Sequence, residues 1–164
     1  RRSSDLHWGI RAGAQRFVEK GRGWWNERMG IRRSSHARYE IWYHFAWGTK
    51  YRKKVFKEKG TREEVKQLFR EIAGHYDLEI KEMEVLSDHV HCLVSAPPRI
   101  AHARIVQILK SVSTKKLFER FTWLQGYYWG GEVWIGGYFM RTVGTGITKE
   151  RIAEYIEEQS EEEI

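Results

Sequence analysis

Two histidines separated by one residue, His89 and His91, are the side chains of this sequence best suited to hold a metal ion. Val90, Cys92 and Val94 alternate with them, a pattern typical of a strand with one buried face. In a strand, the two histidines point to the same side, with Cα atoms about 6.6 Å apart at roughly 3.3 Å per residue. Imidazoles at that spacing can share one metal ion, each nitrogen lying about 2.0–2.1 Å from it. A pair of surface or packing histidines is the alternative, since such triplets also arise by chance.

Tyr155 and Gln159 form a second candidate pair near the C-terminal end. They are four residues apart, so in a helix they share one face, one turn from each other. Ile152 and Ile156 supply the apolar stripe that would dock this helix. Tyr155 lies at the edge of that stripe, where a ring can be half buried and its hydroxyl exposed. A packing tyrosine and a solvated glutamine are the plainer interpretation of the same two residues.

The elements that must position these residues follow from hydrophobic periodicity. Strands are predicted at 39–47, 78–85, 89–95, 133–135 and 138–143, and helices at 61–76, 101–121 and 148–159. Thr61 and Thr148 are the expected caps of the first and last helix. The order predicts an α+β fold, a ferredoxin-like antiparallel sheet with helices on one face and an additional C-terminal helix. The other face of the sheet is left for a site, but the fold by itself selects no function.

The composition describes a basic chain of 164 residues with a net charge of +7. Residues 149–164 are acidic and the rest is basic. This imbalance is compatible with a nucleic-acid partner and equally with solvated lysines and arginines. No apolar run approaches the roughly 18 residues of a membrane span. The single cysteine, Cys92, excludes a disulfide framework and fits a reducing cytoplasm.

Residues 1–30 are rich in arginine, glycine and tryptophan and lack a clean period. We interpret them as an appended basic arm of uncertain role, with residues 31–164 forming the domain. Met29 could start a complete domain, and we expect the arm to be dispensable for activity.

Five blocks of the sequence together resemble the single-tyrosine HUH transposases, which move small bacterial and archaeal insertion sequences as single-stranded DNA. The blocks occur in the order of the family: RRSSH (32–36), YHFAWGTKYR (43–52), SDHVH (87–91), GYFMRTVG (137–144) and YIEEQ (155–159). The resemblance covers about residues 31–160. The arm has no counterpart in the short family members, and the stretch 130–134 fits only loosely.

The resemblance implies a role for each candidate residue. His89 and His91 would be the paired metal ligands, Gln159 a third ligand, and Tyr155 the nucleophile. The ion would be Mg²⁺ or Mn²⁺, and Mn²⁺ accepts imidazole ligands more readily. The implied reaction cleaves and rejoins single-stranded DNA at element ends through a 5′-phosphotyrosine. The implied partners are DNA with a hairpin near those ends and a second copy of the chain, with Tyr155 of one chain completing the metal site of the other.

DNA contacts are expected from basic residues of one loop, the second helix and the last strand: Lys50, Arg52, Lys53, Lys110, Lys115, Lys116 and Arg141. Tyr51 or Trp47 could stack on an unpaired base. The aromatic residues 127–129 and Trp134 could form the dimer contact or belong to the core, and Gly144 and Gly146 could form a hinge before the last helix. Two other functions remain open: an HUH nickase that serves replication or conjugation, and a protein that binds hairpin DNA without cutting it.

Overall fold

A computed structural model describes residues 32–34, 36–144 and 149–161. The chain divides into two units, with the boundary between Glu40 and Ile41. In the first unit, β1 (Arg32–Arg33) and β2 (Arg38–Tyr39) pair antiparallel. The predicted basic arm of residues 1–30 lies outside the described residues, as do the Thr148 cap and the Gly146 half of the hinge.

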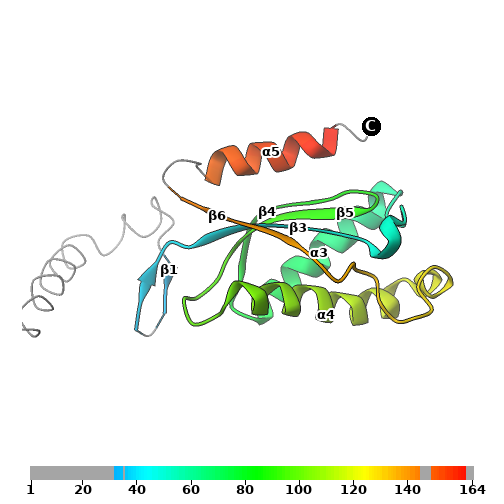
Figure 1. Cartoon of the computed structure of the whole chain (residues 1–164), viewed down its shortest axis with the longest axis horizontal. Coiled ribbons are helices and arrows are strands. Elements are labelled where there is room, and N and C mark those ends of the chain that lie inside the picture. Colours follow the sequence, from blue (N-terminus) through cyan, green and yellow to red (C-terminus); the bar gives the residue numbers. More distant parts are fainter. Residues whose placement is uncertain (1–31, 35, 145–148, 162–164) are drawn as a thin grey trace, which may run out of the picture. The chain divides into compact units, whose positions relative to one another are not determined.

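The second unit is built on a four-stranded antiparallel sheet (Figure 1). Its strands are β3 (Trp42–Gly48), β4 (Glu79–Val85), β5 (His89–Ser95) and β6 (Phe139–Val143), in the spatial order β4-β5-β3-β6. Helix α3 (Lys59–His75) connects β3 to β4, and α4 (His102–Arg120) connects β5 towards β6. This order and the split crossovers confirm the predicted ferredoxin-like α+β fold.

The main core lies between the sheet and the helices α3 and α4, which cover the same face (Figure 1). Phe45 and Trp47 of β3 point into it, as do Val90, Cys92 and Val94 of β5. The alternation therefore buries one side of each strand, as the sequence predicted, and leaves the histidines of β5 on the other side. The helices contribute apolar stripes at helical spacing: Val65, Leu68, Phe69 and Ile72 from α3, and Ile105, Ile108, Leu109 and Leu117 from α4.

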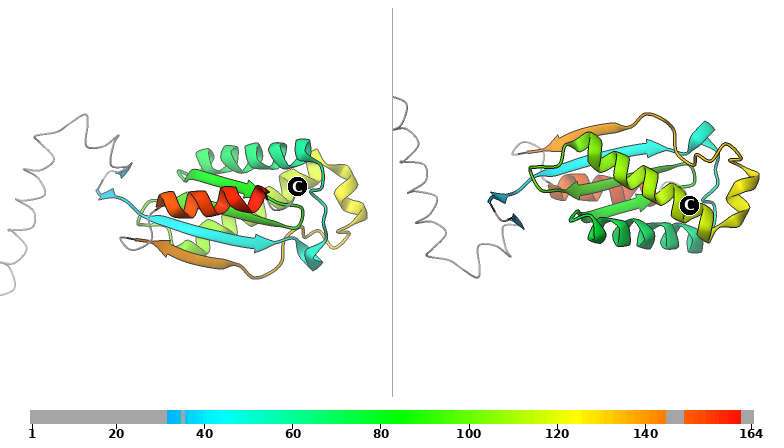
Figure 2. Two further views of the ribbon diagram at one scale, coloured as in Figure 1. Left: turned by 90° about the horizontal axis from the view of Figure 1, so that it is seen from above. Right: turned by 90° about the horizontal axis from the view of Figure 1, so that it is seen from below.

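The C-terminal helix α5 (Lys149–Glu161) lies across the opposite face of the sheet (Figures 1 and 2). Ile152 and Ile156 are buried there against Trp42 and Leu93. Near the start of the helix, Glu150 pairs with Lys81 of β4 at 3.3 Å. Seen from above, α5 runs in the direction of β3, towards the end of the sheet at which β3 terminates (Figure 2, left). The face expected to stay open for a site is thus partly covered by the helix that carries Tyr155.

Three predicted elements differ from the structure. The strand expected at residues 39–47 divides into β2 and β3. Helix α3 begins at Lys59 with Glu58 as its N-cap residue, so Thr61 lies inside the first turn and the predicted cap is wrong. Residues 133–135 form no strand but a single bridge, Thr49 to Trp134, flanked by two backbone hydrogen bonds to Gly48 and Lys50. The Trp134 indole donates to Ser113 Oγ at 2.9 Å.

In the part of the chain that the structure describes, no helix has the length and apolar character needed to cross a membrane.

Candidate active site

His89 and His91 lie side by side on the α5 face of β5, with ring centroids 5.1 Å apart. Across the ladder, His89 is paired with Gly48 and His91 with Ala46. Paired residues of an antiparallel ladder project on the same face, and these two partners have almost no side chain. The small partners leave room above the sheet next to both imidazoles.

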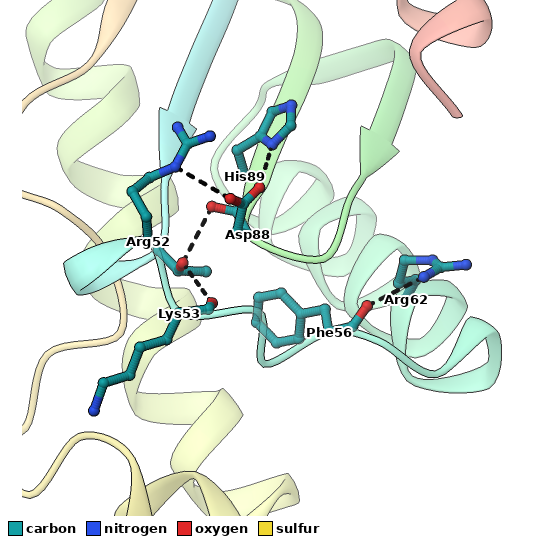
Figure 3. Close-up of polar contacts among 7 residues, drawn as sticks. Arg52, Lys53, Phe56, Arg62, Asp88 and His89 are labelled. Carbon is teal, nitrogen blue, oxygen red and sulfur yellow. Dashed lines mark hydrogen bonds and ion pairs between the residues drawn. The ribbon is translucent and has the colours of Figure 1, made fainter. Parts of the chain in front are cut away.

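The Asp88 carboxylate fixes the orientation of His89. Its Oδ1 atom lies 2.7 Å from Nδ1 of His89, and its Oδ2 atom lies 3.3 Å from Nε of Arg52 (Figure 3). Burial raises the pKa of Asp88, but the hydrogen bond from His89 and the charge of Arg52 outweigh it and hold this pKa below its usual value. An ionised carboxylate only accepts hydrogen bonds, so Nδ1 of His89 is the donor. In the neutral ring, Nε2 then carries the lone pair that can bind a metal.

Gly48 permits this arrangement. A Cβ atom built at Gly48 would lie 2.8 Å from Cδ of Arg52, so Arg52 crosses its backbone at close range. The main chain holds the same corner together, because the Thr49 amide donates to the carbonyl oxygen of Asp88 at 2.8 Å. The Thr49 hydroxyl lies 3.1 Å from the same oxygen. The end of β3 and the start of β5 therefore form one hydrogen-bonded unit.

His91 has a comparable partner in His44 of β3. Its Nδ1 atom lies 3.1 Å from Nε2 of His44, and the two rings stack with centroids 5.4 Å apart. Burial, followed by the nearby His89 and His44, lowers the pKa of His91 to about 4. Burial and the charge of Arg141 lower the pKa of His44 as well. Both rings are therefore neutral at pH 7, the state in which histidine binds metal ions.

A pocket of about 490 Å³ opens on this face of the sheet. Six residues line it: His44, Ala46, His91, Phe139, Arg141 and Ile152. Arg141 supplies a guanidinium, which lies over the Phe139 ring at 5.7 Å from its centroid. A permanently charged guanidinium beside neutral imidazoles suits an anionic ligand such as a DNA phosphate.

Helix α5 forms the roof of this pocket through Ile152. Tyr155 follows Ile152 by three residues and Gln159 by seven, so their backbone positions continue along the same side of the helix. The side chains of Tyr155 and Gln159 lie outside what the structure describes. Among the described residues, no three His, Cys, Asp or Glu side chains form a group that could hold a metal ion. The two predicted ligands on β5 are thus brought together, and their junction with Tyr155 and Gln159 remains a prediction.

The family profile described as "Transposase IS200 like" matches residues 37–159. The chain belongs to the IS200-like transposase family. The match extends from the residue before β2 into the last turns of α5, so it includes both histidines and the helix of Tyr155. The family expected from the sequence blocks is thereby confirmed.

Individual transposases are similar over most of their length. The ISDra2 transposase TnpA of Deinococcus radiodurans is 37% identical over 125 residues, which cover 76% of this chain and 88% of that protein. The transposase of insertion sequence element IS200 from Salmonella typhimurium is 33% identical over 136 residues, 82% of this chain and 88% of its own. A crystal structure of a Deinococcus radiodurans transposase superimposes with a TM-score of 0.62 at 34% identity, covering 78% of this chain and 97% of that one.

The predicted DNA contacts fall on two faces of the molecule. Arg141 lies at the pocket, and the short helix η1 (Lys50–Arg52) lies just beyond Gly48. Lys110, Lys115 and Lys116 lie on α4, on the opposite side of the sheet. Trp47 is buried in the core, so the idea that it stacks on a base is wrong. Of the aromatic residues considered for a dimer contact, Tyr128 and Trp134 are buried, whereas Tyr127 and Trp129 are exposed.

Sequence reasoning missed His44 and Asp88 as members of the site. Asp88 directly precedes His89, and a carboxylate next to a candidate metal-binding histidine is a recognisable signal. His44 lies in an aromatic segment of the sequence, and no neighbouring residue marks it as part of a site. The same period of two that placed His89 and His91 outward would have placed His44 on the face opposite Phe45.

Proposed function

We propose that this chain cleaves and rejoins single-stranded DNA at the ends of an insertion sequence, with Tyr155 as the nucleophile. The main support for this proposal is the pair His89 and His91, which lie on the face of the sheet that the helix of Tyr155 covers (Figure 2). The Nδ1 atom of each histidine is hydrogen-bonded to a neighbouring side chain. Membership of the transposase family supports the same reaction class. We propose that the substrate is hairpin DNA near the element ends and that the reaction takes place in the cytoplasm.

The residues present fit a divalent metal ion. With both Nδ1 atoms engaged, His89 and His91 can each offer Nε2, the arrangement in which a second residue orients a metal-binding histidine. Gln159 would provide an oxygen as the third ligand. When bound, Mg²⁺ or Mn²⁺ would withdraw charge from the scissile phosphate and stabilise the charge that develops on it. Two imidazoles favour Mn²⁺ over Mg²⁺ in binding strength.

In the proposed reaction, the phenolic oxygen of Tyr155 attacks the phosphorus. A phenol with a pKa near 10 is a weak nucleophile at pH 7. It therefore needs a phosphate that is already polarised, with the leaving 3′ oxygen opposite the attacking phenolic oxygen. The Tyr155–phosphorus bond forms while the bond from phosphorus to the 3′ oxygen breaks. The phenol loses its proton, and the 3′ oxygen leaves as a hydroxyl. The resulting 5′-phosphotyrosine keeps the energy of the phosphodiester, so rejoining by a 3′-hydroxyl requires no nucleotide cofactor.

Arg141 is proposed to hold the substrate phosphate in the pocket. Its guanidinium donates several hydrogen bonds in one plane, which suits two oxygens of a phosphate. Its charge also lowers the pKa of His44 after the larger effect of burial. Arg141 therefore favours the neutral state of His44 while it binds the anion.

We further propose a homodimer in which Tyr155 of one chain serves the metal site of the other. Strand exchange must hold two DNA ends at once, and two composite sites related by symmetry would do so. Helix α5 docks on the sheet through a small cluster centred on Ile152 and Ile156, apart from the main core. A helix attached by so limited a contact can exchange between two chains more easily than one embedded in the core.

A covalent adduct is the test of this function. Wild-type protein, a single-stranded hairpin oligonucleotide and Mn²⁺ should yield a protein–DNA species that survives denaturing electrophoresis, and EDTA should abolish it. Tyr155→Phe should bind the same DNA without forming the adduct. Binding without any adduct in the wild type would identify a hairpin-binding protein instead of a nuclease.

A further inference from the structure

A second pocket of about 390 Å³ lies beside η1, just beyond the end of β3. Its walls come from two segments far apart in the sequence, residues 50–53 and 127–132. The two segments are held together at the end of the second one, where the Lys50 amide donates to the carbonyl oxygen of the next residue, Val133, at 2.7 Å. The lining combines aromatic rings with charged groups: Lys50, Tyr51, Lys53, Tyr127, Tyr128, Trp129, Gly130 and Glu132.

Three of the four aromatic side chains that line this pocket are exposed, and Tyr128 is buried. The exposed fraction is 92% for Trp129, 72% for Tyr51 and 48% for Tyr127. Single exposed apolar side chains are common on protein surfaces. Three around one hollow form an apolar patch, which generally marks a binding site.

The lysines of the pocket lie over these rings. Lys53 Nζ is 5.8 Å from the centroid of Tyr51, 6.0 Å from that of Tyr127 and 5.7 Å from that of Tyr128. The same amino group donates to the carbonyl oxygen of Tyr127 at 3.0 Å. Lys50 forms an ion pair with Glu132 across the pocket. Flat rings with an ammonium group among them match the two parts of a nucleotide, its base and its phosphate.

The backbone at Tyr51 is strained in a way that presents its ring. Tyr51 has φ 60° and ψ 16°, and Arg52 has φ 52°. Two consecutive residues with side chains in the left-handed region are uncommon, and such conformations concentrate at ligand-binding sites. The Thr49 hydroxyl, which donates to the carbonyl oxygen of Lys53 at 2.8 Å, helps to close this turn (Figure 3).

The strained turn is connected to the candidate active site. Arg52 binds the Asp88 carboxylate, and the same carboxylate orients His89 (Figure 3). The Asp88 side chain thus lies between the turn that presents Tyr51 and the first histidine of the metal pair. A ligand held by Tyr51 and Trp129 would lie next to a DNA strand whose phosphate occupies the active site.

We propose that this pocket binds an unpaired nucleobase of the single-stranded DNA substrate, beside the phosphate that is cut. Trp129 and Tyr51 stack on the base, and Lys53 contacts an adjoining phosphate. The inference rests on the proposed function, because it takes single-stranded DNA as the substrate. A second copy of the chain could also cover exposed aromatics, but a protein contact would not require a lysine amid the rings.

The test compares two probes on the full chain: a twelve-residue oligothymidylate and the same backbone with abasic sites in place of the bases. Wild-type protein should bind oligothymidylate more tightly, because only bases stack. Trp129→Ala should weaken its binding by roughly 5- to 100-fold and leave the abasic probe unaffected. Trp129→Phe should recover part of the loss. Trp123→Ala is the matched control, since Trp123 is 43% exposed in the neighbouring segment but does not line the pocket.

Charge and stacking can be separated by salt titration. Trp129→Ala removes no charge, so the dependence of affinity on salt should keep its slope, whereas Lys53→Gln should reduce that slope by about 0.7, the value for one phosphate contact on a single strand. Equal loss with Trp129→Ala and Trp123→Ala, or equal loss on both probes, would overturn the proposal. If Trp129→Ala instead changed the molecular mass from that of a dimer to that of a monomer and left the affinity for oligothymidylate unchanged, the proposal would also be overturned. The exposed aromatic residues would then serve self-association.

The adduct assay distinguishes a failure here from a failure of the proposed function. Adduct formation in the wild type combined with no base preference would refute the pocket alone. A Trp129-dependent base preference without an adduct would refute the cleavage reaction and leave the pocket as a base-binding site.

Discussion

The Oδ1 atom of Asp88 lies 2.7 Å from the Nδ1 atom of His89, and in the neutral ring this hydrogen bond leaves Nε2 as the nitrogen that can bind the proposed metal ion. The Nε2 atom of His44 lies 3.1 Å from the Nδ1 atom of His91, so His44 orients the ring of His91 as Asp88 orients that of His89. Each histidine of the pair thus has its own orienting partner, one a carboxylate and one a neutral imidazole.

Asp88→Ala should weaken Mn²⁺ binding by about 10- to 100-fold, because His89 loses the acceptor that fixes its ring. The backbone carbonyl of Asp88 still serves Thr49, so the fold should be retained. Isothermal titration of metal-free protein with Mn²⁺ measures the effect. Asp77→Ala is the control, since Asp77 pairs with Arg99 at 3.5 Å, away from the site. An Mn²⁺ affinity within twofold of the wild type would remove Asp88 from the metal site.

Acid should destabilise the metal-free protein through His91. Its pKa is about 4 in the folded state, against the usual 6.5, so the unfolded chain takes up the proton first. The contribution of His91 to the free energy of unfolding is therefore fully present above pH 6.5. It falls as the pH drops from 6.5 towards 4, by up to about 1.4 kcal/mol per pH unit. Urea denaturation in EDTA at several pH values tests this, with His91→Gln expected to flatten the curve. An equally steep curve in that variant would assign the acid sensitivity to other groups.

Ile156→Ala should release α5 from the sheet. Ile156 is fully buried in a small cluster with Trp42, Leu93 and Ile152, and its truncation should cost about 2–5 kcal/mol of local stability. Hydrogen exchange should accelerate along α5 while β5 stays protected, and cleavage should fall with it. Glu157→Ala, an exposed change on the same helix, is the control. Uniformly faster exchange over α5 and β5 would show that the helix and the sheet unfold as one unit.

Two inactive chains should restore activity when mixed if the sites are composite. His89→Ala/His91→Ala lacks the proposed metal ligands and Tyr155→Phe lacks the proposed nucleophile, so a heterodimer with exchanged helices would contain one complete site. Adduct formation in purified heterodimers would support the trans arrangement. Heterodimers verified by mass that form no adduct would contradict it, and a monomeric mass at micromolar concentration would contradict the dimer.

The sequence was most informative where a pattern is local. The alternation in residues 89–95 predicted β5 to the residue, because Val90, Cys92 and Val94 must share the face that packs on the main core. The Thr61 cap failed, since the helix starts two residues earlier at Lys59 without any side-chain cap. Residues 133–135 look β-prone, but their pairing with the end of β3 is limited to one bridge, between Trp134 and Thr49.

Contacts between distant segments were beyond the reach of such patterns. His44 and His91 are 47 positions apart and meet only because β3 pairs with β5 in one register. The pocket at Tyr51 likewise depends on a turn from residues 50–53 meeting the segment 127–132. Nothing in the order of residues within either segment specifies that meeting.

Peptide mapping of the covalent adduct tests the central claim most directly. Wild-type protein is treated with hairpin DNA and Mn²⁺, digested with nuclease and protease, and sequenced by mass spectrometry. The account predicts a nucleotide joined through its 5′ phosphate to the phenolic oxygen of Tyr155, formed only when metal is present. A nucleotide on any other residue, a linkage through a 3′ phosphate, or the absence of an adduct from DNA-bound, metal-loaded protein would contradict it.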